Sequence, residues 1–200
     1  MNKTIKLEQG KYYHIYNRGI DGCDIFRETA NYEHFLRLYD KYISFVASTF
    51  AWVLMQNHFH LLVQINLRGL TNLEGLKANL RSEERINKQF SNFFNAYTKA
   101  YNKRYHRTGS LFEHSFKRKQ IDNPNYLKQV LLYIHNNPVH HGFCEQPIDY
   151  PWSSYFSCIS IKPTRLQRDS VIGWFDSEAN FKHAHKDKLN IYKIESFLEI

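Results

Sequence analysis

The stretch Met55-Gln56-Asn57-His58-Phe59-His60-Leu61-Leu62-Val63-Gln64 organises the interpretation of this chain. Its apolar, aromatic and β-branched residues, without Gly or Pro, are typical of a β-strand. Alternate side chains of a strand project to opposite faces, so His58 and His60 share one face while Phe59 and Leu61 share the other. The sequence therefore predicts a strand with one apolar face and one face that carries two imidazoles.

Two neighbouring imidazoles on a rigid strand could provide half of a metal site, because neutral histidine is the commonest protein ligand for divalent ions. The chain has 11 histidines, so a pair with this spacing could also arise by chance. Both interpretations stay open on the pair alone.

Helices and strands are expected on both sides of this stretch. We expect a strand over 11–18, a helix from 31 to about 47, and a strand over 49–56, with 57–64 as its continuation or its hairpin partner. A loop is expected over 66–72, and the segment from there to 81 is ambiguous. A helix with an apolar stripe is expected from Ser82 as far as Tyr101, and a further strand is expected within 111–121. This order suggests helices packed on one sheet.

A second well-bounded helix is predicted from about 124 to 136. Asp122 or Asn123 can cap it, and Pro124 suits its first position. Pro138 disfavours helical backbone at Asn137 and is expected to end the helix there.

The balance of charges favours a polyanionic partner. The formal net charge is +8 and the sequence pI is about 9.3, and nucleic acid is the default partner for such a chain. A charge run is usually a solvated face, so the basic cluster after residue 102 favours DNA only modestly. The candidate DNA-binding residues are Arg18, at the end of the first strand, and Lys103, Arg104, Arg107, Lys117, Arg118 and Lys119.

Three cysteines without close spacing argue against a disulfide framework and a structural zinc site, and they fit a reducing compartment. No run approaches transmembrane length, so we expect a cytoplasmic protein that does not enter the membrane. We divide the chain into a domain over 1–156 and a tail over 157–200 that packs on it, with a possible helix over 177–188.

Several motifs in this order resemble the single-tyrosine HUH transposases. After His58 and His60 comes Tyr133, which lies just before Asn136-Asn137-Pro138-Val139. Two further stretches are similar to those of the REP-associated tyrosine transposase branch. They are the end of the tyrosine helix, Asn137-Pro138-Val139-His140-His141-Gly142, and the later segment Tyr150-Pro151-Trp152-Ser153-Ser154-Tyr155. The resemblance covers roughly residues 11–156 and leaves the tail outside.

The resemblance implies an α+β fold of the HUH endonuclease type, a ferredoxin-like antiparallel sheet with helices packed on it, here with a C-terminal extension. It implies cleavage and rejoining of single-stranded or hairpin DNA through a 5′-phosphotyrosine. Tyr133 would be the nucleophile, and His58, His60 and Asn137 would bind Mg²⁺ or Mn²⁺. We expect a monomer rather than a homodimer.

Other interpretations compete with these roles. Tyr126 lies about two helical turns before Tyr133 and is the alternative nucleophile. His135, His140 and His141 lack standard zinc spacing, and we expect them near phosphate or solvent. As a whole, the chain could instead be a domesticated DNA-hairpin binding protein without turnover, or a replication-initiator-type nickase.

Overall fold

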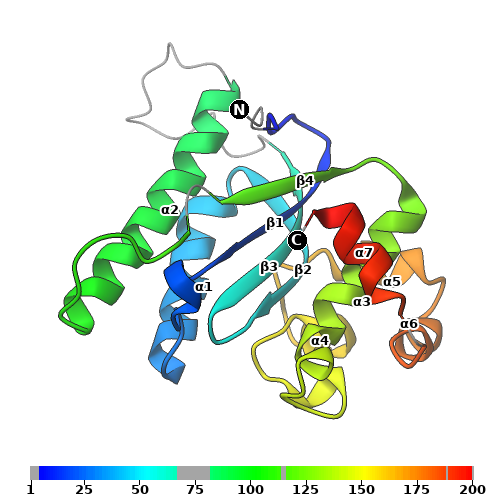
Figure 1. The fold of residues 1–200 in the computed structure, drawn as a ribbon. Helices are drawn as coiled ribbons and strands as arrows, with labels where there is room; N and C mark the ends of the chain where they lie inside the picture. The colour runs from blue at the N-terminus through cyan, green and yellow to red at the C-terminus, as the bar shows by residue number, and fades with distance from the viewer. Residues whose placement is uncertain (1–4, 67–81, 114–115, 188, 200) are drawn as a thin grey trace.

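The computed structural model describes residues 5–66, 82–113, 116–187 and 189–199. These residues form a four-stranded antiparallel sheet, β1 (Tyr12–Arg18), β2 (Ala47–Leu54), β3 (His58–Ile65) and β4 (Lys117–Ile121), in the order β2-β3-β1-β4 (Figure 1). Helix α1 (Thr29–Ile43) lies between β1 and β2 in the chain, and α2 (Ser82–Arg104) lies between β3 and β4. This βαββαβ order with this strand order is the ferredoxin-like arrangement, so the predicted fold class is confirmed.

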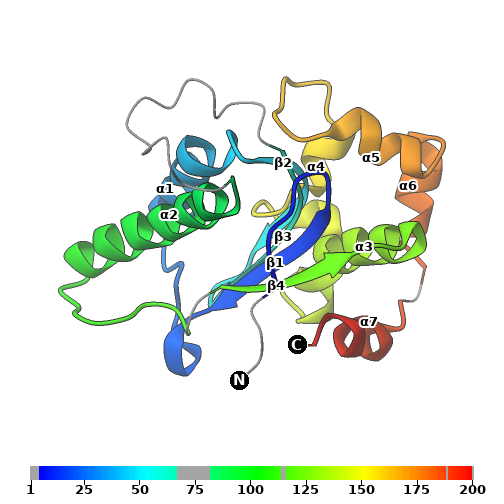
Figure 2. The same cartoon turned by 90° about the horizontal axis from the view of Figure 1, so that it is seen from above.

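Helices cover both faces of the sheet (Figure 2). Helices α1 and α2 lie on one face, and α3 (Pro124–His140) lies on the other with the tail helices. The remaining elements are the 3₁₀ turns Ile20–Gly22 and Pro147–Asp149 and the helices α4 (Tyr155–Ile159), α5 (Arg168–Trp174), α6 (Glu178–Ala184) and α7 (Ile191–Leu198).

Each face of the sheet has its own hydrophobic core. Phe59, Leu61 and Val63 of β3 belong to the core under α1 and α2. Leu62, between them in sequence, belongs to the core under α3. Every residue of the stripe predicted for α2 is buried in the first core: Ile86, Phe90, Phe93, Phe94, Tyr97 and Tyr101. The alternation along β3 therefore separates two interiors, as the strand period requires.

The stretch 55–64 is not one strand, because residues 55–57 form a tight connection and β3 begins at His58. The Met55 N–H donates to the His58 carbonyl at 2.8 Å, which closes a hairpin between β2 and β3. The hairpin alternative for 57–64 is therefore correct. The helix expected to reach residue 47 ends at Ile43, because Ala47 already pairs with Ile65 in the sheet.

Helix α3 begins where the sequence predicts and ends later. Asn123 caps it by accepting a hydrogen bond from the backbone N–H of Asn125. The predicted end before Pro138 is wrong, because α3 continues to His140 with Pro138 inside its last turn. Pro138 is buried against the protein, and tertiary packing there outweighs the cost of one missing helical hydrogen bond.

The tail folds back onto the α3 face. Its residues Val171, Phe175, Phe181, Ile194 and Leu198 are buried in the same core as α3. The helix expected over 177–188 is the shorter α6, which is capped by Ser177. The segment expected as a loop and ambiguous turn over 66–81 lies, from residue 67 on, outside the described residues.

His135 is the clearest error in the sequence interpretation of this region. Its Nδ1 lies 2.9 Å from His185 Nε2, its Nε2 lies 2.7 Å from Ser154 Oγ, and the side chain is fully buried. His140 and His141 are exposed, as expected. His135 differs because it lies on the side of α3 that packs against the tail, where two partners satisfy both ring nitrogens.

None of the helices in the described part of the chain combines the length and the apolar character that a membrane span needs.

Candidate active site

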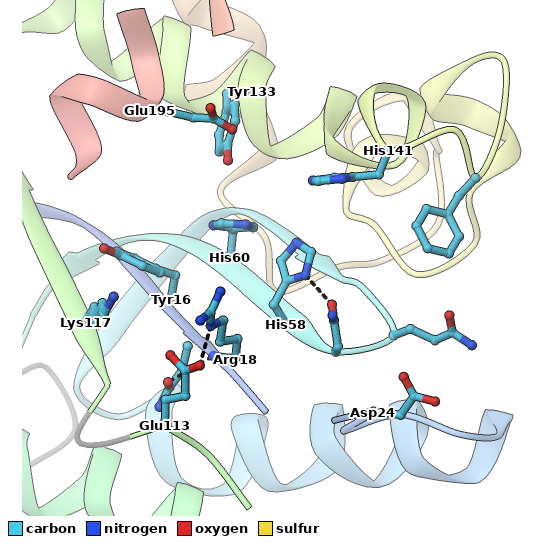
Figure 3. Close-up of a pocket in the computed structure, with 14 residues that line it drawn as sticks. Tyr16, Arg18, Asp24, His58, His60, Glu113, Lys117, Tyr133, His141 and Glu195 are labelled. Carbon is cyan, nitrogen blue, oxygen red and sulfur yellow. Dashed lines mark hydrogen bonds and ion pairs between the residues drawn. The ribbon is translucent and has the colours of Figure 1, made fainter. Parts of the chain in front are cut away.

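A cavity of about 590 Å³ lies where β1, β3 and α3 meet α7 (Figure 3). The C-terminal end of β1 and the N-terminal end of β3 form one wall, because the antiparallel register sets Tyr16 opposite His60 and Arg18 opposite His58. The side chains that line the cavity are Tyr16, Asn17, Arg18, Asp24, Gln56, Asn57, His58, His60, Glu113, Lys117, Tyr133, His141, Phe143 and Glu195. Five candidate residues therefore share one cavity, namely Arg18, His58, His60, Lys117 and Tyr133, whereas Asn137 is not among the residues that line it.

His58 lies between two amide side chains. Its Nδ1 is 2.7 Å from Asn57 Oδ1, and its Nε2 is 3.2 Å from Asn137 Oδ1. Burial lowers the pKa of His58 to about 4, so the ring is neutral near pH 7 and carries one N–H. One of the two oxygens therefore faces a lone pair rather than a donor. With the proton on Nδ1, Nε2 and Asn137 Oδ1 are two acceptors directed at each other.

His60 is held by a histidine of the neighbouring strand. His14 Nε2 lies 2.9 Å from His60 Nδ1, and the two rings stack with centroids 5.0 Å apart. Burial lowers the pKa of His14 to about 3 and lowers the pKa of His60 well below its usual value. Both rings are therefore neutral, and the hydrogen bond at Nδ1 leaves Nε2 of His60 as the nitrogen available to the cavity.

These donors fit a divalent cation. Adjacent ligand atoms in an octahedral site with bonds of about 2.1 Å are about 3 Å apart, and His58 Nε2 and Asn137 Oδ1 are 3.2 Å apart. The Asn137 Nδ2 group is buried and has no hydrogen-bond partner among the described residues. Within the described residues, no three His, Cys, Asp or Glu side chains form a metal-binding group.

Tyr133 lies on α3 above the histidines. Its side chain is 4% exposed, and its ring packs edge-on to His60 with centroids 5.5 Å apart. Burial and the negative charge of Glu195 raise the pKa of Tyr133, although nearby Asn137 lowers it. The resting phenol is therefore protonated at neutral pH.

Tyr126 lies away from this arrangement. Its ring stacks on Phe197 of α7 at 4.1 Å between centroids, and it is not part of the cavity wall. The geometry favours Tyr133 over Tyr126 as the residue that could meet a ligand beside the histidines.

Three candidate DNA-binding residues lie on the cavity side of the sheet. Arg18 Nε is 2.5 Å from Glu113 Oε1, and Lys117 Nζ lies 5.6 Å from the centre of the Tyr16 ring. Lys119 forms an ion pair with Glu199 of the tail. Arg18 and Lys117 line the cavity, Lys119 does not, and Arg18 and Lys119 are each paired with a carboxylate.

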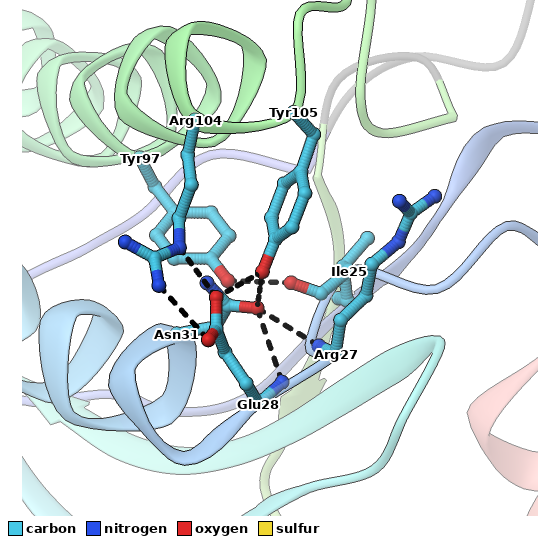
Figure 4. A network of polar contacts seen from close by, with 7 residues as sticks. All are labelled: Ile25, Arg27, Glu28, Asn31, Tyr97, Arg104 and Tyr105. Carbon is cyan, nitrogen blue, oxygen red and sulfur yellow. Dashed lines mark hydrogen bonds and ion pairs between the residues drawn. The ribbon is translucent and has the colours of Figure 1, made fainter.

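The other candidates lie elsewhere. Arg118 is opposite Ile15 in the sheet, on the α2 side, where it donates to Asn87 and packs over Phe116. Arg104, at the end of α2, pairs with Glu28 before α1 (Figure 4). Lys103 is exposed on the same helix end, and Arg107 lies 5.8 Å from the Tyr101 ring. The basic cluster of the sequence is therefore split between two faces of the sheet.

Other cavity residues were not identified from the sequence. Tyr16 follows from the alternation of β1 once the pairing with β3 is known, as does His14, which contacts His60 and does not itself line the cavity. Phe143 follows the end of α3, close to His141, which was expected near phosphate or solvent and lines the cavity. Glu195 lies in the tail, where no sequence pattern connects it with the histidines.

No protein-family model matches the chain, and no curated protein matches it either. Among solved structures, a REP-associated tyrosine transposase bound to a REP hairpin is similar, with a TM-score of 0.53 and 17% identity over 82% of this chain and 88% of that one. At this identity the likeness shows a shared fold. A bacterial tRNA(His) guanylyltransferase-like protein in complex with ATP is 14% identical over 97% of this chain and 72% of that one, and its TM-score of 0.36 is too low for a shared fold to be inferred.

Proposed function

We propose that this protein nicks and rejoins single-stranded or hairpin DNA through a 5′-phosphotyrosine on Tyr133, with the help of a divalent metal ion. One observation carries the proposal: a tyrosine on α3 lies over a neutral histidine pair on β3, within a single cavity. The similarity in fold to a transposase bound to a DNA hairpin supports it.

His58, His60 and Asn137 would hold Mg²⁺ or Mn²⁺, which supplies charge stabilisation to a bound phosphate. Asn57 and His14 would orient the two imidazoles through their Nδ1 atoms. Tyr133 would attack the phosphorus in line with the leaving 3′-oxygen. The phosphotyrosine keeps the energy of the phosphodiester bond, so rejoining needs no nucleotide cofactor.

The DNA strand would cross the cavity side of the sheet. Arg18, Lys117 and Lys119 would contact phosphates there, and the Tyr16 and Phe143 rings would offer surfaces on which bases stack. Because α3 packs on the sheet of its own chain, one copy contains the whole residue set. A monomer is therefore the proposed active form.

The test is cleavage of end-labelled hairpin oligonucleotides, followed on denaturing gels in the presence of Mn²⁺. Tyr133→Phe is expected to abolish the covalent protein-DNA product, while Tyr126→Phe retains it. Chelation is expected to stop cleavage, and His58→Ala is expected to do the same. A Tyr133→Phe protein that still forms the product would remove Tyr133 from the proposal.

Hairpin binding without turnover is the second candidate, because Tyr133 is buried and carries a raised pKa. The same experiment separates the two functions. Tight, salt-sensitive binding across a broad pool of hairpins, with no cleavage at any metal concentration, would favour binding alone.

A further inference from the structure

We propose that Glu195 of α7 accepts the proton of the Tyr133 hydroxyl as that oxygen attacks the DNA phosphate. The inference rests on the proposed function, and it assigns a catalytic role to a residue of the tail. It makes α7 part of the active site rather than a cover over it.

Tyr133 needs a proton acceptor at its own hydroxyl. A phenol has an ordinary pKa near 10, well above neutral pH. The tyrosinate is therefore scarcely present before the reaction, and the proton must leave as the bond to phosphorus forms. A base in contact with the oxygen makes this possible without prior ionisation.

Most of the other basic groups at the cavity are engaged. Each of the two imidazoles on β3 has its Nδ1 in a hydrogen bond and its Nε2 reserved for the proposed metal. Glu113 is held by Arg18 at 2.5 Å. Glu195 is a carboxylate of the cavity wall, and its negative charge acts on Tyr133. Figure 3 shows the two side chains together at the α3 side of the cavity.

Helix α7 is fixed well enough to hold a base in place. Asn190 caps it by accepting the Lys193 backbone N–H at 3.1 Å. At its other end, the Tyr16 hydroxyl donates to the Glu199 carbonyl at 3.1 Å, and Ile194 and Leu198 are buried under the helix. These contacts position Glu195, which is half-buried beside Tyr133.

Metal binding is a less suitable role for Glu195. It lines the same cavity as His58 and His60. However, no three His, Cys, Asp or Glu side chains among the described residues are arranged to hold a metal, so Glu195 does not complete a set with the two histidines. Its nearest chemical use is at the Tyr133 hydroxyl.

The Tyr133 oxygen forms a bond to phosphorus, the bond from phosphorus to the 3′-oxygen breaks, and the Tyr133 proton moves to a Glu195 carboxylate oxygen. The departing 3′-oxygen takes a proton from water. In the rejoining step, a 3′-hydroxyl attacks the phosphotyrosine, its proton passes to water, and the bond from phosphorus to the Tyr133 oxygen breaks as Glu195 returns its proton to that oxygen.

The kinetic test compares Glu195→Gln, Glu195→Asp and Glu178→Gln under single-turnover conditions with a hairpin oligonucleotide and Mn²⁺. Glu178 is a matched control, because it lies in the same tail and pairs with Lys182 on α6. We expect Glu195→Gln to slow adduct formation by a factor of roughly 10² to 10⁴ with hairpin affinity retained. Glu195→Asp should recover part of the rate, and Glu178→Gln should match the wild type.

An unchanged rate in Glu195→Gln would overturn the proposal, and a faster rate would show instead that the carboxylate hinders the nucleophile. If the wild type itself forms no adduct, the proposed function and the inference fall together.

A second readout needs neither metal nor DNA. The ¹³C resonance of the Tyr133 Cζ atom, assigned by its absence in Tyr133→Phe, is expected to move in Glu195→Gln and to stay in place in Glu178→Gln. A resonance that does not move would show that Glu195 does not contact the hydroxyl. That result would overturn the inference while leaving the proposed function intact.

Discussion

The two faces of β3 differ although they belong to the same eight residues. On the face toward α1 and α2, Phe59 packs against the Phe35 and Phe94 rings, with centroids 5.2 and 5.6 Å apart, in a closed aromatic core. On the face toward α3, His58 and His60 line a cavity. Buried apolar residues stabilise the sheet on both faces, and the α3 face also presents polar side chains to the cavity.

This difference shows how a strand can serve packing and chemistry at once. Side chains alternate with a period of two, so a change at one residue affects only one face. Substitutions of buried apolar residues on the α1 and α2 face should therefore act on stability, and substitutions of the cavity residues on the α3 face should act mainly on activity.

The largest effect is expected from Phe59→Ala. Phe59 is fully buried, and truncation of such a ring costs about 3–5 kcal/mol of unfolding free energy. Urea unfolding followed by circular dichroism measures this loss. A loss below about 1 kcal/mol would mean that the aromatic face is not the main source of stability.

His60→Ala is the counterpart on the other face. Losing a ligand of the proposed metal is expected to cost several kcal/mol of transition-state stabilisation, or roughly a thousandfold in the cleavage rate. Unfolding free energy should change much less than in Phe59→Ala. A His60→Ala protein that unfolds early but cleaves normally would reverse the assignment of the two faces.

Acid should destabilise the α3 face selectively. Burial lowers the pKa of His185 to about 4 and that of His135 well below its usual value. In the unfolded state these histidines have a pKa near 6.5, so on acidification the unfolded state binds protons before the folded state does. Their contribution to the unfolding free energy is therefore complete above pH 6.5 and is lost as the pH falls toward 4. Between these two pH values, the unfolding free energy should fall by roughly 1.4 kcal/mol per pH unit for each such histidine. Unfolding free energies at pH 7 and pH 5 measure it, and a His185→Gln protein with an unchanged slope would contradict this origin.

His14→Phe should weaken metal binding without removing a ligand. It deletes the hydrogen bond at His60 Nδ1 while keeping an aromatic ring in the stack. Loss of such a partner typically reduces metal affinity 10- to 100-fold. When the cleavage rate is measured against Mn²⁺ concentration, the half-saturating concentration should be higher than in the wild type. The maximal cleavage rate should be the same at saturating Mn²⁺. A reduced maximum at saturating Mn²⁺ would mean that His14 does more than orient His60.

The smallest effect is expected from Lys117→Gln on the cavity side. It should lower the slope of log affinity against log salt for a single-stranded oligonucleotide by about 0.7, the value for one phosphate contact. Lys99→Gln on α2 is the control on the opposite face, where Lys99 is exposed. Equal changes in both proteins would indicate that DNA is not confined to the cavity side.

Much of the fold could be predicted from local patterns. The alternation across His58, Phe59, His60 and Leu61 gave both faces of β3, and the apolar stripe of α2 gave its buried side. The end of α3 could not be predicted in this way, because Pro138 disrupts an isolated helix but is accommodated here by burial in the last turn.

The candidate site was predictable only where a motif marked it. His58, His60 and Tyr133 fall into a recognisable order, and they line one cavity. His14 required the strand register, because its partner His60 is distant in sequence. Glu195 required the docking of the tail, which depends on packing between α7 and α3 that no periodicity reveals.

The most direct test of the central claim is peptide mapping of the wild-type protein after incubation with hairpin oligonucleotides and Mn²⁺. We expect a covalent DNA adduct on the peptide that contains Tyr133, and no adduct when the metal is chelated. An adduct on any other residue, or none despite tight hairpin binding, would contradict the account.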